Sequence, residues 1–178
     1  MGRRLKDYKY IRSKPKVSPK AFVASGVKLI GAVSIGDYSS IWYNAVIRAD
    51  INRIEIGSHT NIQDACILHV SDELGVKIAD YVTVGHGAIL HACSVQSGAV
   101  IGLGAKVLNA ANIGAESVVA AGTLVPPKFV VPARTLAKGH PAKIARKLTK
   151  KEIEENRWWA NKYEQLIGKY RKHYQMKT

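Results

Sequence analysis

Aliphatic side chains recur at every sixth residue through most of this chain, and this period constrains the fold more than any other feature. The period slips only where three residues are added after Ile47, four after Leu68, and one is lost after Leu90. The complete series is Val23, Leu29, Ile35, Ile41, Ile47, Ile56, Ile62, Leu68, Ile78, Val84, Leu90, Val95, Ile101, Val107, Ile113, Val119 and Val125. A period of six fits neither an amphipathic helix nor a single alternating strand. It indicates a solenoid of stacked coils.

A second signal, independent of the first, supports this interpretation. Four residues after most of the aliphatic positions stands a small or β-branched side chain: Val27, Val33, Ser39, Ala45, Thr60, Cys66, Val82, Ala88, Ala99, Ala105, Ala111, Ser117 and Thr123. Glycine often follows the aliphatic residue directly, as at Gly102 and Gly114, where a tight corner could use its free backbone. We therefore predict coils with three short flat faces, stacked as parallel strands about 4.8 Å apart.

This pattern resembles that of the hexapeptide-repeat proteins over residues 21–140. The resemblance implies a mainly β fold, a left-handed parallel β-helix; the hand comes from the resemblance and not from the period. A basic N-terminal segment, residues 1–20, precedes the β-helix, and residues 141–178 form a linker and a C-terminal helix. We interpret the prolines between Pro126 and Pro132 as breaking the repeat.

The last segment of the chain has the pattern of an amphipathic helix. Thr149 and Glu152 have the spacing of a capping box at its start. Apolar side chains then follow at roughly helical spacing: Ile153, Trp159, Tyr163, Leu166, Ile167 and Tyr170. Since a lone helix must bury such a face, we expect an α-helix packed along the side of the β-helix, with Trp158, Trp159 and Tyr170 serving this packing.

Composition places few further limits on function. No window holds the run of about eighteen apolar residues that a membrane-spanning helix needs, and the N-terminus lacks the apolar stretch of a secretory signal. We therefore expect a cytoplasmic protein without a membrane role. Cys66 and Cys93 are too few for a disulfide framework or a cysteine-based zinc site, and both fall on small interior positions, where we expect them to pack in the core.

The net charge of +14 raises the question of a nucleic-acid partner. The charge is confined to the two ends of the chain. Residues 1–20 carry eight Lys and Arg against one Asp, residues 143–178 carry eleven against four Glu, and the segment between carries eight of each sign. Because the C-terminal charges alternate with acids on the expected helix, we interpret them as a solvated surface, and we do not expect nucleic acid as the partner.

Three of the six histidines can be placed by counting hexads. Leu68 and Leu90 are three steps apart, which is one full coil, and His69 and His91 follow them directly. These two imidazoles should therefore lie one above the other at the same corner, about one strand spacing apart. Two imidazoles at that separation can bind one metal ion.

His86 completes the set only if a second copy of the chain takes part. It lies two residues after Val84, one face away from His91. In a homotrimer with threefold symmetry, each subunit's His86 would meet its neighbour's pair, and three identical sites would form. Three neutral imidazoles suit Zn²⁺, Fe²⁺ or Co²⁺ and leave one position open. Water bound there ionises near neutral pH, which favours hydration or hydrolysis chemistry.

Several motifs resemble those of the γ-class carbonic anhydrase family. They are IRAD (47–50), NIQD (61–64), ILHV (67–70), VGHGAILHAC (84–93), GLGA (102–105) and PAK (141–143), so that the likeness covers nearly the whole chain. The resemblance implies a trimeric left-handed β-helix with a metal ion between subunits. It matches His69, His86 and His91 to the ligands, two from one subunit and one from its neighbour, and Asp64 to an acid at the interface.

The same resemblance assigns roles to the polar residues around the metal. Arg48 and Asp50 match a pair that joins across the subunit interface near the site. Gln63 matches the residue that hydrogen-bonds the metal-bound water, and Asn61 matches another polar residue of the pocket. Tyr163 stands where many family members place a helix tyrosine at the pocket mouth. The implied activity is reversible hydration of CO₂ to bicarbonate by a zinc-bound hydroxide, the reaction of a metal-dependent lyase.

The chain departs from the best-understood members of the family at two places. They carry a glutamate directly after the IRAD-type aspartate, where this chain has Ile51. They also carry a longer acidic loop with a proton-shuttle glutamate, where this chain has only VSDELGVK. Asp72 or Glu73 would have to export the proton instead. The shorter pattern resembles the carbonic-anhydrase/acetyltransferase-like or ferripyochelin-binding subgroup.

Two other function classes therefore stay open. One is acyl-transfer or thioesterase chemistry on coenzyme A substrates, because hexapeptide-repeat folds also carry acyltransferases, and the basic ends of the chain could meet the coenzyme A phosphates. The other is a non-catalytic scaffold whose metal ion holds the trimer together, which the missing glutamates favour.

Overall fold

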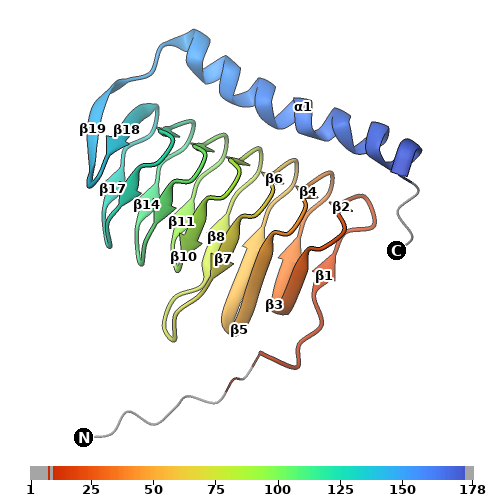
Figure 1. Ribbon diagram of the computed structural model, residues 1–178. Helices are drawn as coiled ribbons and strands as arrows, with labels where there is room; N and C mark the ends of the chain where they lie inside the picture. The colour runs from red at the N-terminus through yellow and green to blue at the C-terminus, as the bar shows by residue number, and fades with distance from the viewer. Residues whose placement is uncertain (1–7, 9, 175–178) are drawn as a thin grey trace, which may run out of the picture.

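The computed structural model describes residue 8 and residues 10–174 of the chain. It is mainly β: a parallel solenoid of short strands with one long helix, α1 (Lys150–Tyr174), along its side (Figure 1). Among the described residues, no helix is both long and apolar enough to cross a membrane.

The strands lie on three faces of the solenoid. The first face holds the N-terminal halves of β3 (Lys28–Ile35) and β5 (Val46–Ile56) with β7 (Ile67–His69), β10 (Ile89–His91), β13 (Lys106–Val107) and β16 (Leu124–Val125). The second holds the C-terminal halves of β3 and β5 with β1 (Lys16–Val17), β8 (Val76–Ile78), β11 (Ser94–Val95), β14 (Asn112–Ile113) and β17 (Val130–Val131).

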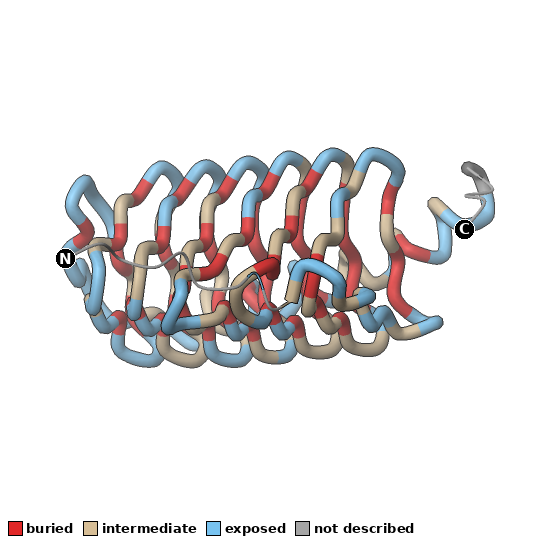
Figure 2. Tube along the Cα trace, turned by 90° about the horizontal axis from the view of Figure 1, so that it is seen from below, coloured by how far each residue is buried: buried red, intermediate tan, exposed pale blue. Residues whose placement is uncertain are grey.

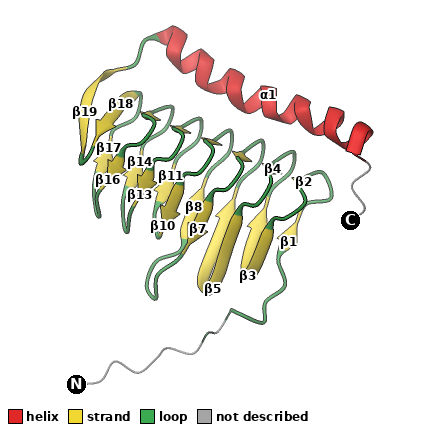
Figure 3. Cartoon of the chain, in the orientation of Figure 1, coloured by secondary structure: helices red, strands yellow, loops and turns green. Residues whose placement is uncertain are grey.

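The third face carries α1, and we call it the helix-bearing face. Its strands are β2 (Phe22–Val23), β4 (Ser40–Ile41), β6 (Asn61–Ile62), β9 (Thr83–Val84), β12 (Val100–Ile101), β15 (Val118–Val119), β18 (Thr135–Gly139) and β19 (Ala142–Lys147). Figure 3 shows α1 crossing this stack of strands from the last coils back to the first. All pairings are parallel except the last, in which β19 runs antiparallel to β18.

The register of the strands confirms the six-residue repeat. Val95 pairs with Ile113 and Ile101 with Val119, eighteen residues on. Leu68 pairs with Leu90, which confirms that one coil separates them. From Ile41 onward every aliphatic residue of the series is buried, and the buried positions recur in successive coils (Figure 2). Cys66 and Cys93 are buried in the same core as free thiols, as expected.

The glycines that follow the aliphatic residues serve a different purpose from the one expected. None of them has a positive φ; a Cβ on Gly114 would instead lie 2.5 Å from the backbone nitrogen of Ala133, one coil later. The left-handed corners are taken mostly by other residues, Tyr38, His59 and Tyr81 among them. Close approach of neighbouring coils, rather than backbone freedom, therefore requires glycine at these positions.

The prolines after Val125 do not break the repeat. Val131 and Ala137 continue the six-residue spacing and are fully buried. Pro126 follows β16 and Pro132 follows β17, the last strands of their two faces. No later coil pairs with these strands, so a residue without an N–H group is tolerated there. The expected linker also contains β19, a strand that the sequence pattern did not predict.

Helix α1 begins at the predicted capping box. The Thr149 N–H donates to the Glu152 carboxylate at 2.8 Å, and the Glu152 N–H donates to the Thr149 hydroxyl at 3.3 Å. Ala160 and Ile167 are buried against the solenoid. The Tyr170 ring packs edge-on against Trp42, with the ring centroids 4.9 Å apart.

The expectation that Trp158 and Trp159 pack against the solenoid is wrong. They are 54% and 42% exposed. The residues of α1 that face the solenoid are instead Asn156, Ala160, Tyr163, Ile167 and Tyr170, whose spacing is helical. Trp158 lies on the side of α1 away from this contact, whereas Trp159 lies at the edge of the contact, where it lines a hollow together with Tyr163.

Candidate metal centre

His69 and His91 lie one above the other at the ends of β7 and β10, as the hexad count predicts. The two residues are paired in register in the parallel ladder. The Nδ1 atom of His69 is 3.2 Å from the Nε2 atom of His91, and the ring centroids are 5.2 Å apart. The solenoid therefore brings one nitrogen of each ring to the same point.

The other nitrogen of each ring faces an oxygen acceptor. The Nε2 atom of His69 is 3.3 Å from the Asp50 carboxylate, and the Nδ1 atom of His91 is 2.7 Å from the side-chain oxygen of Asn109. If these two nitrogens carry the protons, the facing nitrogens of His69 and His91 both present lone pairs. Two lone pairs at 3.2 Å repel one another unless a cation lies between them.

The residues present therefore fit a metal ion. Zinc–nitrogen bonds of about 2.0–2.1 Å in a tetrahedral site place two ligand nitrogens about 3.3 Å apart, close to the 3.2 Å between His69 and His91. Ligand histidines also typically donate their second N–H to a carboxylate or carbonyl oxygen, as Asp50 and Asn109 allow here. The sequence interpretation missed Asn109, although it lies one eighteen-residue coil after His91.

Burial and a neighbouring positive charge favour a neutral imidazole at His69. Burial lowers the pKa of His69 first, and the positive charge of Arg48 lowers it further. Burial alone would raise the pKa of Asp50, but hydrogen bonds from the Arg48 side chain and from its own backbone N–H hold it below the usual value. Within the chain, Arg48 and Asp50 form a salt bridge with each other.

His86 lies elsewhere on the subunit. It follows β9 on the helix-bearing face, and its Nδ1 atom is 2.7 Å from the Asp64 carboxylate. This contact leaves Nε2 available in a side chain that is 46% exposed. Across residue 8 and residues 10–174, no group of three His, Cys, Asp or Glu side chains within one chain could hold a metal ion.

Gln63 and Asn61 form one hydrogen-bonded row beside His86. The Gln63 amide nitrogen donates to the Asn61 side-chain oxygen at 3.1 Å, and the Asn61 amide nitrogen donates to the Thr83 hydroxyl at 2.9 Å. The Gln63 side-chain oxygen accepts from the His86 backbone N–H at 3.2 Å. These contacts hold the Gln63 amide in one orientation.

A hollow of about 370 Å³ adjoins this row, between α1 and the helix-bearing face; we call it the His86 hollow. Its lining consists of Gln63, Thr83, Gly85, His86, Val100, Ile101, Gly102, Leu103, Trp159 and Tyr163. Burial raises the pKa of Tyr163 to about 12, and the hydroxyl therefore stays protonated. The structure thus brings Gln63, His86 and Tyr163 together, with Asn61 behind Gln63, but His69, His91, Arg48 and Asp50 form a separate group.

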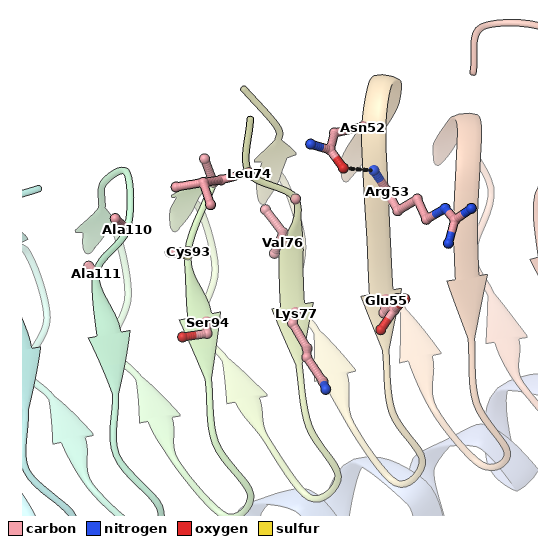
Figure 4. A pocket seen from close by; sticks show the side chains of 12 residues that line it. Asn52, Arg53, Glu55, Leu74, Val76, Lys77, Cys93, Ser94, Ala110 and Ala111 are labelled. Carbon is pink, nitrogen blue, oxygen red and sulfur yellow. Dashed lines mark hydrogen bonds between the residues drawn. The ribbon is translucent and has the colours of Figure 1, made fainter. Parts of the chain in front are cut away.

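A larger hollow of about 480 Å³ lies on the second face, near the corner that follows His91 (Figure 4). Leu74 and Lys77 line it, together with Asn52 and Arg53 of β5. The short loop that precedes Leu74 contains Asp72 and Glu73, which are exposed. Within the described part of the chain, the carboxylates that pair with His69 and His86 are those of Asp50 and Asp64, and not those of Asp72 or Glu73.

Known proteins share much of this sequence. The chain is 43% identical over 145 residues to a mitochondrial γ carbonic anhydrase 2 of Arabidopsis thaliana, covering 78% of this chain but only 52% of the plant protein. It is 41% identical over 150 residues to a probable carbonic anhydrase of Methanocaldococcus jannaschii, covering 84% of this chain and 94% of that protein. The chain belongs to the γ-class carbonic anhydrase family. No model of a protein family matches the chain.

Solved structures extend the comparison of this γ-class family member. A putative acetyltransferase of Bacillus cereus superposes with a TM-score of 0.90 at 39% identity, covering 92% of this chain and 95% of that one. A hexapeptide transferase family protein of Anaplasma phagocytophilum superposes with a TM-score of 0.85 at 38% identity, covering 88% and 92%. A left-handed β-helix fits these neighbours.

Proposed function

We propose that this protein is a metal-dependent carbonate dehydratase that works as a homotrimer in the cytoplasm and hydrates CO₂ reversibly to bicarbonate. The observation that carries the proposal is the pair of facing nitrogens on His69 and His91, 3.2 Å apart and each backed by an oxygen acceptor. The family membership supports the same activity, since relatives at 41–43% identity are named carbonic anhydrases.

The metal ion would be held by His69 and His91 of one subunit and His86 of the next. His86 fits this role because Asp64 orients its ring and leaves Nε2 free, in the way that Asp50 and Asn109 orient the other two. Zn²⁺ suits three imidazoles, and Fe²⁺ or Co²⁺ is also compatible. When bound, such an ion lowers the pKa of water toward about 7 and so supplies hydroxide near neutral pH.

The chain's own residues bind and orient the small substrate. Gln63 is fixed by Asn61 and by the His86 backbone, and its remaining amide proton donates to an oxygen of CO₂ or bicarbonate. Tyr163 stays protonated and donates from the opposite side of the His86 hollow. Arg48, paired with Asp50, contributes positive charge at the subunit contact and attracts the bicarbonate anion.

A mixing experiment tests the shared site. His86→Ala and His91→Ala trimers should each fail to bind Zn²⁺, with His140→Ala as the control that binds normally. When the two defective proteins are unfolded, mixed in equal amounts and refolded, about one quarter of the contacts pair an intact His69/His91 corner with an intact His86. Zinc content and stopped-flow CO₂ hydration should recover to about that fraction. No recovery of bound zinc would contradict a site shared between subunits.

The second candidate function is acyl transfer or thioester hydrolysis on coenzyme A substrates. It is favoured by the solved structures at 38–39% identity, whose names are those of acetyltransferases and hexapeptide transferases. Acetyl-coenzyme A turnover without CO₂ hydration would select it. Zinc that restores the mixed trimer without any turnover would instead select a metal-stabilised scaffold.

A further inference from the structure

A further hollow on the second face gathers positive charge beside the N-terminal segment. Its volume of about 350 Å³ falls in the range of about 300–1,000 Å³ that holds small organic ligands. We call it the Arg53 hollow; its polar lining consists of Ser13, Lys14, Lys16, Ser34, Arg53 and Glu55. These residues come from β1, β3, β5 and the segment before β1, and none of them lines the His86 hollow or contacts His69 or His91.

Three of the side chains form a row across neighbouring strands. Lys16 pairs in register with Ser34, and Ser34 pairs with Glu55 on the next strand. Since neighbouring strands lie about 4.8 Å apart, the backbones of Lys16 and Glu55 are about 10 Å apart. Among the ion pairs of the described residues, none includes Lys16 or Glu55. The space between them, over Ser34, is therefore open to a ligand.

Arg53 brings a guanidinium group to the same place. Its side chain extends from β5 toward β3 (Figure 4), and the guanidinium carbon lies 5.6 Å from the centre of the Tyr10 ring. The Tyr10 N–H in turn donates to the Asp50 carbonyl oxygen at 3.1 Å, and the Tyr10 carbonyl oxygen accepts from the Ser13 N–H at 2.9 Å. This turn fastens the N-terminal segment to the solenoid and carries Lys14 to the hollow.

The lining suits a phosphate group that is joined to a group bearing hydroxyls. Lys14, Lys16 and Arg53 supply three positive charges, and a guanidinium group can bind two phosphate oxygens at once. Glu55 lies among them and would repel a ligand made only of phosphates. Its carboxylate accepts hydrogen bonds, however, and so suits sugar hydroxyls. This mixture of charges favours a phosphorylated sugar over inorganic polyphosphate or nucleic acid.

We propose that the Arg53 hollow binds a sugar phosphate, with Lys16 and Arg53 on the phosphate group and Glu55 accepting from a sugar hydroxyl. Ser34, which stands between Lys16 and Glu55 in the row, donates to a phosphate oxygen. The ligand is a free sugar phosphate or the ribose phosphate part of a nucleotide, because both carry this chemistry. The site is separate from the metal centre and does not depend on the proposed function.

Calorimetric titration of the full chain tests the proposal. Ribose 5-phosphate should bind about tenfold more tightly than inorganic phosphate, because a hydrogen bond to the Glu55 carboxylate adds to the phosphate contacts. Tripolyphosphate carries more charge but no hydroxyl group, and it should bind more weakly than ribose 5-phosphate. Tighter binding of tripolyphosphate, or equal binding of ribose 5-phosphate and inorganic phosphate, would reduce the hollow to a basic surface and overturn the proposal.

Adenosine 5′-monophosphate distinguishes the two sources of the ligand. Tighter binding of this nucleotide than of ribose 5-phosphate would identify a nucleotide, and weaker binding would identify a free sugar phosphate. Either order supports the proposal, since both ligands present the same phosphate ester. Failure of both to bind would overturn it.

Glu55→Ala tests the part of the site that recognises hydroxyl groups. Inorganic phosphate should bind this variant more tightly than the wild type, because a repelling charge is removed. The roughly tenfold preference for ribose 5-phosphate should disappear, because the acceptor is lost. The preference is a ratio of two phosphate ligands, so the removed repulsion affects both alike. An unchanged preference would contradict the role of Glu55.

A matched pair of variants separates a built site from general attraction by positive charge. Arg53→Ala should weaken ribose 5-phosphate binding about tenfold. Lys143→Ala removes the same charge from β19, in the last coils of the solenoid, where solvent ions screen it from the hollow, and should leave binding within about twofold. Both side chains are exposed, and circular dichroism checks that both variants fold. An equal loss in the two variants would overturn the proposal.

Discussion

The Nδ1 atom of His59 lies 2.7 Å from the Glu164 carboxylate, although 105 residues separate them in sequence. The His59 ring is stacked between Tyr38 and Tyr81, with centroid distances of 5.3 and 4.6 Å, at the same left-handed corner of three successive coils. The contact between His59 and Glu164 holds α1 against the solenoid at the residue that directly follows Tyr163. The shape of the His86 hollow therefore depends on it.

Loss of the His59–Glu164 contact should destabilise the docked helix. Glu164→Gln should lower the free energy of unfolding by up to about 1 kcal/mol, because both side chains are partly exposed. His59→Ala should cost more, since it also removes the ring stacked on Tyr38 and Tyr81. His59→Phe keeps a ring and removes only the polar contact. Urea unfolding of the three variants measures this order, and a larger loss in His59→Phe than in His59→Ala would contradict it.

Acid should loosen the start of α1. The Arg146 side chain, followed by the Thr149 backbone and hydroxyl, lowers the pKa of Glu152 to about 2 from its usual 4.5. A carboxyl whose pKa falls on folding stabilises the folded state fully above its unfolded pKa. That contribution should therefore be lost as the pH falls from about 4.5 to about 2. The helical signal in circular dichroism should fall over this range, and Glu152→Gln should remove the change while Glu155→Gln keeps it.

Asn109 should support the metal ion without touching it. Its side-chain oxygen accepts from the His91 ring at 2.7 Å, and loss of such partners typically lowers metal affinity 10- to 100-fold. Asn109→Ala should show this loss in a competition titration with a chromogenic chelator, whereas Asn109→Asp, which keeps an oxygen acceptor, should largely restore affinity. Asn112→Ala is the control, because the Asn112 side-chain oxygen accepts from the Ser94 hydroxyl on the second face and not from a histidine. Equal zinc affinity in Asn109→Ala and the wild type would refute the role.

Two glycines should respond differently to the same substitution. Gly114→Ala would push a methyl group to within 2.5–2.7 Å of backbone atoms of the next coil, and should cost about 3 kcal/mol of unfolding free energy. Gly122 has a φ of +67° and open space around its Cβ position, so Gly122→Ala should cost about 1 kcal/mol from backbone strain alone. Thermal and urea unfolding compare the two variants. Similar losses would show that corner geometry, and not coil spacing, governs these positions.

The two thiols should be inert in the folded protein. Burial raises the pKa of both Cys66 and Cys93 to about 12, which suppresses the thiolate form at neutral pH. Ellman's reagent at pH 8 should therefore react with neither thiol until guanidinium unfolds the chain, after which both should react. Rapid labelling of the native protein would show that one coil opens easily.

The solenoid could be predicted from sequence because the interior admits only one kind of side chain at each repeated position. Ile101 and Val119 recur because they stack directly on each other in the ladder. The continuation through Val131 was missed because proline is normally a strong break signal. At Pro126 and Pro132 that signal fails, since the strands before them have no later neighbour. The strand β19 was missed because its pairing is antiparallel and follows no hexad.

The candidate site was only partly accessible to sequence reasoning. Counting coils places His69 beside His91, because both follow the same interior position one coil apart. Counting coils does not show which oxygen atom lies next to the other ring nitrogen of each histidine. For this reason Asn109, which contacts His91, was overlooked. Trp159 was assigned to the packed face of α1, because an apolar residue near the right spacing looks the same whether it covers the solenoid or an adjoining hollow.

The reversed strand β19 gives the stack of coils a defined last member. It is the terminal strand of its sheet, and it offers an antiparallel edge where a parallel one would be needed to add another coil. Lys143, Arg146 and Lys147 are exposed along it. An edge strand that is charged, and that runs opposite to the direction a further coil would need, discourages the head-to-tail stacking of one molecule onto the next. Such an edge works against fibre formation, a hazard inherent in any architecture that repeats along one axis.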